Sequence, residues 1–254
     1  MKGRLVLLVV YVMLGTFSML ILKAQTSGEC KQTIKITFIN KVNQQHLNLD
    51  STKYINCRNE IFSISKLKYY ISNIGLQTFG KKNFFEQNSY HLINEEDPES
   101  KSFSFLILPD NYETISFLIG VDSIKNVTGA QTDALDPLNG MFWTWNTGYI
   151  MFKMEGNSEQ STLSNKKIEY HIGGFTGTNN VLRMVKLNFK EYQIVLKKYK
   201  SSQIIIQFDL DKIWNTTNDL SITQTPVCTT PGVLATNIAN NYSAAFKIIE
   251  VVNH

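Results

Sequence analysis

The chain has 254 residues and a formal net charge of +4, from 25 lysines and arginines against 21 acidic residues. Lys2, Arg4 and Lys23 precede residue 25, so the remainder carries 22 cations against 21 anions, a net charge of +1. A chain this close to neutral lacks the basic face that nucleic-acid binding requires, which argues against that class of partner.

The first 24 residues predict a secretory signal peptide. A basic start precedes an apolar run over residues 5–22, and a polar stretch follows. Such a run partitions into the membrane while the flanking cations stay in the cytoplasm. We expect cleavage near Ala24, no membrane span afterwards, and a periplasmic, cell-surface or secreted location. An uncleaved anchor is the alternative, because Leu22 is not small and the run approaches the length of a membrane span.

Alternation of apolar and polar residues recurs along the rest of the chain and predicts half-buried strands. Only residues 234–243 show helical spacing. Many short strands with polar turns indicate an all-β sandwich or barrel. We expect an antiparallel β-sandwich of Greek-key, immunoglobulin-like type with long loops, in a single domain over residues 25–254. The predicted strands are 34–38, 62–76, 103–108, 115–121, 149–154, 182–189, 192–196, 204–210 and 246–252.

Three cysteines, Cys30, Cys57 and Cys228, follow the predicted signal peptide. An oxidising compartment favours one disulfide and one free thiol, and the sequence does not rank the three possible pairings. Because no two cysteines have C-x-x-C spacing, a thiolate zinc site is not expected.

Trp143 and Trp145 form the most unusual local pattern in the chain. At i and i+2 of a strand, their indoles face the same side. Two indoles on one face can be part of the core, because each buries a large apolar area. They can also line a site that a metal or a redox partner approaches, and the residues alone leave both interpretations open.

Three aspartates, Asp122, Asp133 and Asp136, precede the tryptophans. Their spacing does not match a calcium-binding loop, and Asp136 before a proline is typical of a turn, so we interpret them as turn residues. The chain also lacks the G-x-S-x-G and H-E-x-x-H motifs of hydrolases, so we expect a protein that is not an enzyme.

Several motifs occur in the order found in the MbnP-like copper-binding family, and the chain resembles that family over about residues 34–252. The most specific is W-x-W-x-x-G-Y within residues 137–149. Others are Tyr-Tyr-Ile-Ser-Asn-Ile at 69–74, the segment 112–123, His-Ile-Gly-Gly at 171–174, Pro-Gly at 231–232 and the segment 238–242.

The resemblance implies an exported bacterial β-sandwich that handles copper and is the partner or substrate of a di-haem cytochrome c peroxidase-like enzyme. In the family, that enzyme oxidises a tryptophan to kynurenine beside a histidine-bound copper. The resemblance therefore marks Trp143 and Trp145 as the oxidisable pair. The copper itself suits nitrogen and sulfur donors.

The sequence departs from this pattern at the metal ligands. The family's W-x-H is absent, and Cys228 precedes the Pro-Gly motif where relatives carry histidine. His171, beside two glycines, and Cys228, a soft donor, are the candidate ligands. A hydrogen-bonded surface histidine and a structural cysteine are the alternatives, and we expect surface positions for His46, His91 and His254. If no metal binds, the protein is a metal-free β-sandwich interaction module of the cell envelope.

Overall fold

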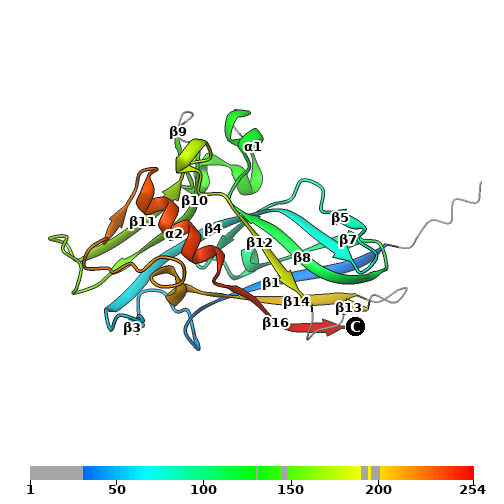
Figure 1. Ribbon diagram of the computed structural model, residues 1–254, viewed down its shortest axis with the longest axis horizontal. Helices are drawn as coiled ribbons and strands as arrows, with labels where there is room; N and C mark the ends of the chain where they lie inside the picture. Colours follow the sequence, from blue (N-terminus) through cyan, green and yellow to red (C-terminus); the bar gives the residue numbers. More distant parts are fainter. Residues whose placement is uncertain (1–30, 130, 145–147, 190–193, 196–200) are drawn as a thin grey trace, which may run out of the picture.

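The computed structural model describes residues 31–129, 131–144, 148–189, 194–195 and 201–254. The expected signal peptide, Cys30 and Trp145 lie outside these ranges. Strands dominate the described chain, and they form two sheets that run along the longest axis of the molecule (Figure 1). Among the described residues, no helix has the length and apolar character needed to cross a membrane.

The smaller, five-stranded sheet is built around β1 (Gln32–Val42). Ile34, Ile36 and Phe38 alternate with exposed or half-buried residues and are fully buried, as expected for a strand with one face in the core. On one side β1 pairs with β14 (Ser202–Asp209), which in turn pairs with β16 (Phe246–Asn253). On the other side it pairs with β7 (Ser102–Ile107) and β2 (Gln45–His46).

The larger sheet has eleven strands and is organised by one long strand, β4 (Ile61–Thr78). Its main order is β12, β8, β4, β10, β11, β15, with the short strands β3, β5, β6, β9 and β13 attached at its margins. The main strands are β12 (Arg183–Asn188), β8 (Asn111–Ile119), β10 (Gly148–Asn157), β11 (Lys167–Gly173) and β15 (Val227–Cys228). The short strands are β3 (Tyr54–Ile55), β5 (Asn83–Phe85), β6 (Tyr90–Asn94), β9 (Phe142–Thr144) and β13 (Ile194–Val195).

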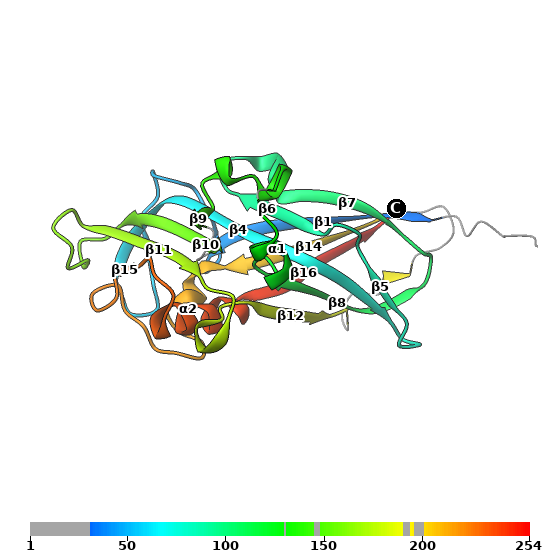
Figure 2. The same cartoon turned by 90° about the horizontal axis from the view of Figure 1, so that it is seen from above.

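Helices are few and short in the described chain. The helix α2 (Val233–Ser243) lies beside β11 and β12 and contacts both (Figure 2). Its Tyr242 ring is 5.2 Å from the ring of Phe152 on β10, so the helix closes the core on this side. The other helix, α1 (Ser123–Val127), and five 3-10 turns lie in the connections. These turns are η1 (Pro98–Lys101), η2 (Asp133–Leu135), η3 (Pro137–Asn139), η4 (Gly177–Asn179) and η5 (Leu210–Ile213).

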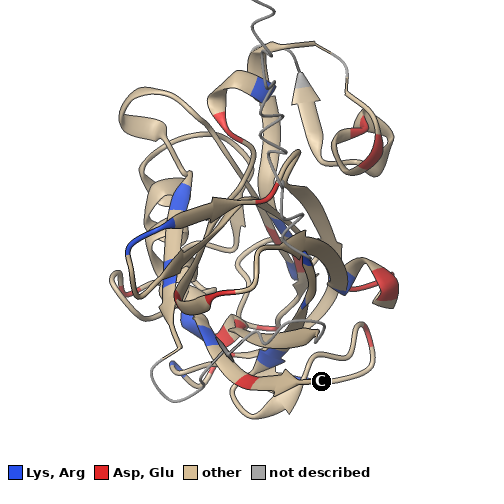
Figure 3. Ribbon diagram, turned by 90° about the vertical axis from the view of Figure 1, so that its right-hand side faces the viewer, with Lys and Arg blue, Asp and Glu red and all other residues tan. Residues whose placement is uncertain are grey.

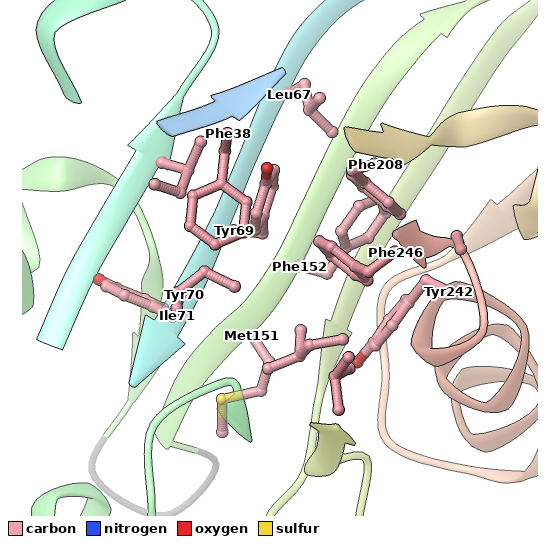
Figure 4. Packing of buried hydrophobic residues seen from close by; sticks show 14 of the residues in the cluster. Phe38, Leu67, Tyr69, Tyr70, Ile71, Met151, Phe152, Phe208, Tyr242 and Phe246 are labelled. Carbon is pink, nitrogen blue, oxygen red and sulfur yellow. The ribbon is translucent and has the colours of Figure 1, made fainter. Parts of the chain in front are cut away.

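Aromatic side chains from both sheets fill the space between them (Figure 4). Phe208 and Phe246 of the smaller sheet stack with ring centroids 4.4 Å apart, and Tyr69 of β4 meets Phe208 edge-on at 5.2 Å. Each such ring buries a large apolar area, and these contacts bind the two sheets into one core. Acidic and basic residues are interspersed over strands and loops when the molecule is seen end-on (Figure 3).

The structure confirms the all-β expectation and corrects its antiparallel detail. The pairs β1–β14 and β11–β15 are parallel, so both sheets are mixed. Parallel neighbours arise because the chain returns to each sheet after a long excursion rather than through a hairpin. The Greek-key, immunoglobulin-like detail is not confirmed by the observed strand order.

Candidate metal centre

Strand β11 places His171 on the outer face of the larger sheet. Ile168, Tyr170 and Ile172 are buried, so the alternate residues Glu169 and His171 point away from the core. In the antiparallel register with β10, Lys153 lies opposite His171 and Glu155 lies opposite Glu169. One imidazole and two carboxylates therefore meet on neighbouring strands.

The three side chains are close enough to share an ion. The distance from His171 Nε2 to Glu155 Oε1 is 2.8 Å, and that to Glu169 Oε1 is 3.6 Å. One ligand atom from each residue lies within 4.8 Å of the other two. The side chain of His171 is 13% exposed, that of Glu155 29% and that of Glu169 39%, so the cluster is accessible without being fully solvated.

Two lysines surround the carboxylate of Glu155. Lys66 Nζ is 3.6 Å from Glu155 Oε2, and Lys153 Nζ is 3.6 Å from Glu155 Oε1. Burial by itself raises the pKa of Glu155, but the hydrogen bond from His171 and the two ammonium charges outweigh it. The net effect is a lowered pKa, so this carboxylate is ionised at neutral pH and available as a ligand.

The donor geometry suits a metal ion. Two ligands each about 2.1 Å from a metal and about 90–110° apart are separated by roughly 3 to 3.5 Å. The distances from His171 Nε2 to the two carboxylate oxygens are 2.8 and 3.6 Å, just below and just above that range. Small side-chain movements would bring both distances into it. Three protein ligands would leave at least one coordination position for water or another molecule.

Trp143 lies on the same face of β11 as His171. A Cβ atom built on Gly173, two residues beyond His171, would be 2.6 Å from Cζ3 of Trp143 and 2.9 Å from the carbonyl oxygen of Tyr149. The indole therefore covers Gly173 directly, and only glycine leaves room for it. Trp143 is partly buried and packs against the core, in agreement with the core interpretation.

The Gly-Tyr end of the tryptophan motif has a structural role. Gly148 has a φ of +72°, and Asn126 Oδ1 would be 2.2 Å from a Cβ at this position. That oxygen accepts a hydrogen bond from the Tyr149 backbone nitrogen at 2.9 Å, and the Tyr149 hydroxyl donates to the Leu135 carbonyl at 2.7 Å. These contacts tie the connection that contains α1 and η2 to β10.

Cys228 does not belong to the His171 cluster. It pairs with Tyr170 in the parallel β11–β15 register and is buried on the core side, whereas His171 points outward. Burial raises the pKa of its thiol to about 11, which disfavours the thiolate that a metal needs. Cys228 and the exposed Cys57 are both free thiols, so the candidate disulfide between them is not formed.

The other polar residues singled out in the sequence have structural partners. Asp122 caps α1 by accepting from the backbone nitrogens of Ile124 and Lys125, and Asp136 caps η3. This confirms their interpretation as turn residues. His91 stacks on Phe103 with ring centroids 3.5 Å apart and hydrogen-bonds Glu86 at 2.9 Å.

Sequence reasoning missed Glu155 and Glu169. The predicted strand 149–154 ends before Glu155, and no strand was predicted for 167–173, although Ile168, Tyr170 and Ile172 alternate with polar residues there. This alternation predicts a strand that presents Glu169 and His171 together, so two of the three residues of the cluster could have been found.

Replacing His171 with alanine is expected to raise the pKa of Glu155. The hydrogen bond that lowers this pKa disappears, while the burial that raises it and the two lysines remain. A carboxyl-carbon NMR titration of wild type and variant measures the shift. His91→Ala is the control, because His91 contacts Glu86 instead and should leave the Glu155 titration unchanged.

Comparison with known proteins gives one family and one structural relative. The family model described as MbnP matches residues 31–230. The fold is similar to that of MbnP from Methylosinus trichosporium, with a TM-score of 0.49 and 12% sequence identity, over 74% of this chain and 79% of the other. No curated protein matches the sequence.

Proposed function

Because the chain belongs to the MbnP family, we propose that it is an exported, non-catalytic copper-handling protein that acts as the partner or substrate of a di-haem peroxidase-like enzyme. Copper, rather than another ion, is proposed from the family resemblance together with the donors available here. An imidazole is a borderline donor that accepts copper in either oxidation state.

The observation that carries this proposal is the shared position of His171 and Trp143. His171 is two residues from Gly173 on β11, and the Trp143 indole packs directly over Gly173. An ion bound at His171 would therefore have an oxidisable indole close by on the same face of the sheet. This proximity takes the place of the missing W-x-H motif.

Oxidation of Trp143 is tested by mass spectrometry of the protein isolated from its native host with the di-haem enzyme present. We expect an oxygenated or kynurenine form at Trp143 and none at Trp214, which is fully buried and serves as an internal control in the same digest. Tandem spectra separate Trp143 from Trp145. Unmodified tryptophan at both positions, with the partner present and active, would contradict the proposal.

Copper binding is tested by titration of the purified protein with Cu(I) under a competing chelator. His171→Ala should abolish binding, because it removes the nitrogen donor of the cluster. Cys228→Ser should leave it unchanged, since that thiol, on β15, faces the core on the side of the sheet opposite His171. Unchanged binding in His171→Ala would exclude this site.

A second candidate is a metal-free interaction module of the cell envelope. It is favoured by the pairing of Glu155 with Lys66, Lys153 and His171, which neutralises its carboxylate without a metal. Tight stoichiometric copper binding by the wild-type protein would exclude this alternative.

A further inference from the structure

We propose that Glu155, Glu169 and His171 form a site for a divalent cation of the zinc or copper(II) class. This inference deepens the proposed function and rests on it for the choice of the His171 site. It goes further in naming the complete ligand set and the charge of the ion.

The donors select the ion. Two carboxylates and one imidazole supply hard oxygen and borderline nitrogen, which suit Zn(II) and Cu(II) better than the soft Cu(I). Cys228 is the described cysteine on the strand that pairs with β11. Its thiol faces the core and is protonated at neutral pH. A second histidine is not in the cluster formed by the described residues.

The strands fix the ligands before any ion arrives. Glu155 and Glu169 are opposite each other in the β10–β11 register, and His171 follows Glu169 by two residues on the same face. The side chains therefore need only small rotations to close on a cation, because the backbone already sets their spacing. Of the three, Glu169 is the most exposed, and its 3.6 Å approach to His171 is too long for a hydrogen bond.

Lys66 and Lys153 lie beside the carboxylate of Glu155 and offset its charge. Each ammonium lies 3.6 Å from an oxygen of Glu155, so an incoming cation must displace them and is repelled by them. Lys153 also donates to the Gly140 carbonyl at 3.1 Å, which gives it another partner once displaced. Removing the charge of Lys66 should therefore tighten binding rather than weaken it.

The test is calorimetric titration of the metal-free protein with Zn(II) and Cu(II) salts. We expect one ion per chain in the wild type and at least about tenfold weaker binding in Glu169→Gln. Glu96→Gln is the matched control, because it makes the same change beside Lys68 without touching the cluster. Lys66→Gln should bind about threefold more tightly or better. Circular dichroism confirms that each variant is folded.

Electron paramagnetic resonance of the Cu(II) form gives a readout independent of affinity. We expect hyperfine coupling to a single imidazole nitrogen, lost in His171→Ala. Equal affinity in Glu169→Gln and wild type, or no divalent binding at all, would overturn the inference.

The outcomes separate this inference from the proposed function. If Cu(I) binds through His171 while Zn(II) and Cu(II) do not, the proposed function stands and the divalent site is wrong. A second outcome is that divalent ions bind as expected, Cu(I) does not bind, and Trp143 stays unmodified in the presence of the di-haem enzyme. In that case the divalent site stands and the proposed function is wrong.

Discussion

Replacing Gly148 with alanine is expected to lower the free energy of unfolding by about 2 to 5 kcal/mol. The left-handed backbone at φ +72° costs any residue with a Cβ about 1–2 kcal/mol. The new methyl group would also displace Asn126 Oδ1, and the buried hydrogen bond to the Tyr149 nitrogen would be lost at a further cost of about 1–3 kcal/mol. Urea unfolding measures the sum.

Gly140 provides a control with the same backbone and no steric conflict. Its φ is +70°, and no atom lies within 4 Å of a Cβ built there. Gly140→Ala should therefore cost only the strain, about 1–2 kcal/mol. Equal losses in the two variants would show that the Asn126 contact contributes nothing, and that the Gly-Tyr motif is not held as described.

Replacing Glu60 with alanine is expected to cost about 3–5 kcal/mol of stability, because each buried donor left unpaired costs about 1–3 kcal/mol. Its buried carboxylate accepts hydrogen bonds from the backbone nitrogens of Ile222 and Thr223 at 2.9 Å each and from Asn56 Nδ2 at 2.8 Å. Alanine would leave the buried donors of Ile222 and Asn56, and the part-buried nitrogen of Thr223, without this partner. Glu250→Ala, at an exposed position of β16, should change stability by no more than about 0.5 kcal/mol.

The part of the Glu60 contribution that depends on its charge should be lost in acid. Burial raises its pKa, but the hydrogen bonds from Asn56, Thr223 and Ile222 outweigh this effect and the pKa is lowered. The stabilisation is therefore complete above the unfolded value near pH 4.3 and is lost as the pH falls through the lower folded value. The gap in unfolding free energy between wild type and Glu60→Ala should be widest at neutral pH and should narrow as the pH falls through the folded pKa of Glu60. A gap that stays constant into acid would mean that the carboxylate charge is not responsible.

The sequence predicted strands where one face alone is buried. Residues 34–38 became part of β1, where alternation of side chains marks the face that meets the core. Residues 62–76 became part of β4, which alternates at its start and is buried on both faces over residues 69–72. The expected helix at 234–243 also agrees with α2, whose buried residues recur at helical spacing. The parallel pairs could not be predicted, since the local pattern of a strand does not name its neighbour.

The same limit applies to the candidate metal centre. His171 was selected from the sequence, but Glu155 joins it only through the register of β10 against β11. Cys228 lies outside this cluster for a related reason, because its pairing with Tyr170 turns the thiol toward the core. Trp143 can pack against this face because Gly173 has no side chain. The two residues are thirty positions apart in the sequence, so no local pattern indicates their contact.

The parallel pairing of β1 with β14 has a consequence for biosynthesis. Ile34 is aligned with Ser202 and Lys41 with Asp209, so an early strand obtains this neighbour only after more than 160 further residues have left the ribosome. Contacts of such large sequence separation form slowly. One edge of β1 should consequently stay unpaired until β14 has been made, which leaves the unfinished smaller sheet exposed to aggregation during synthesis.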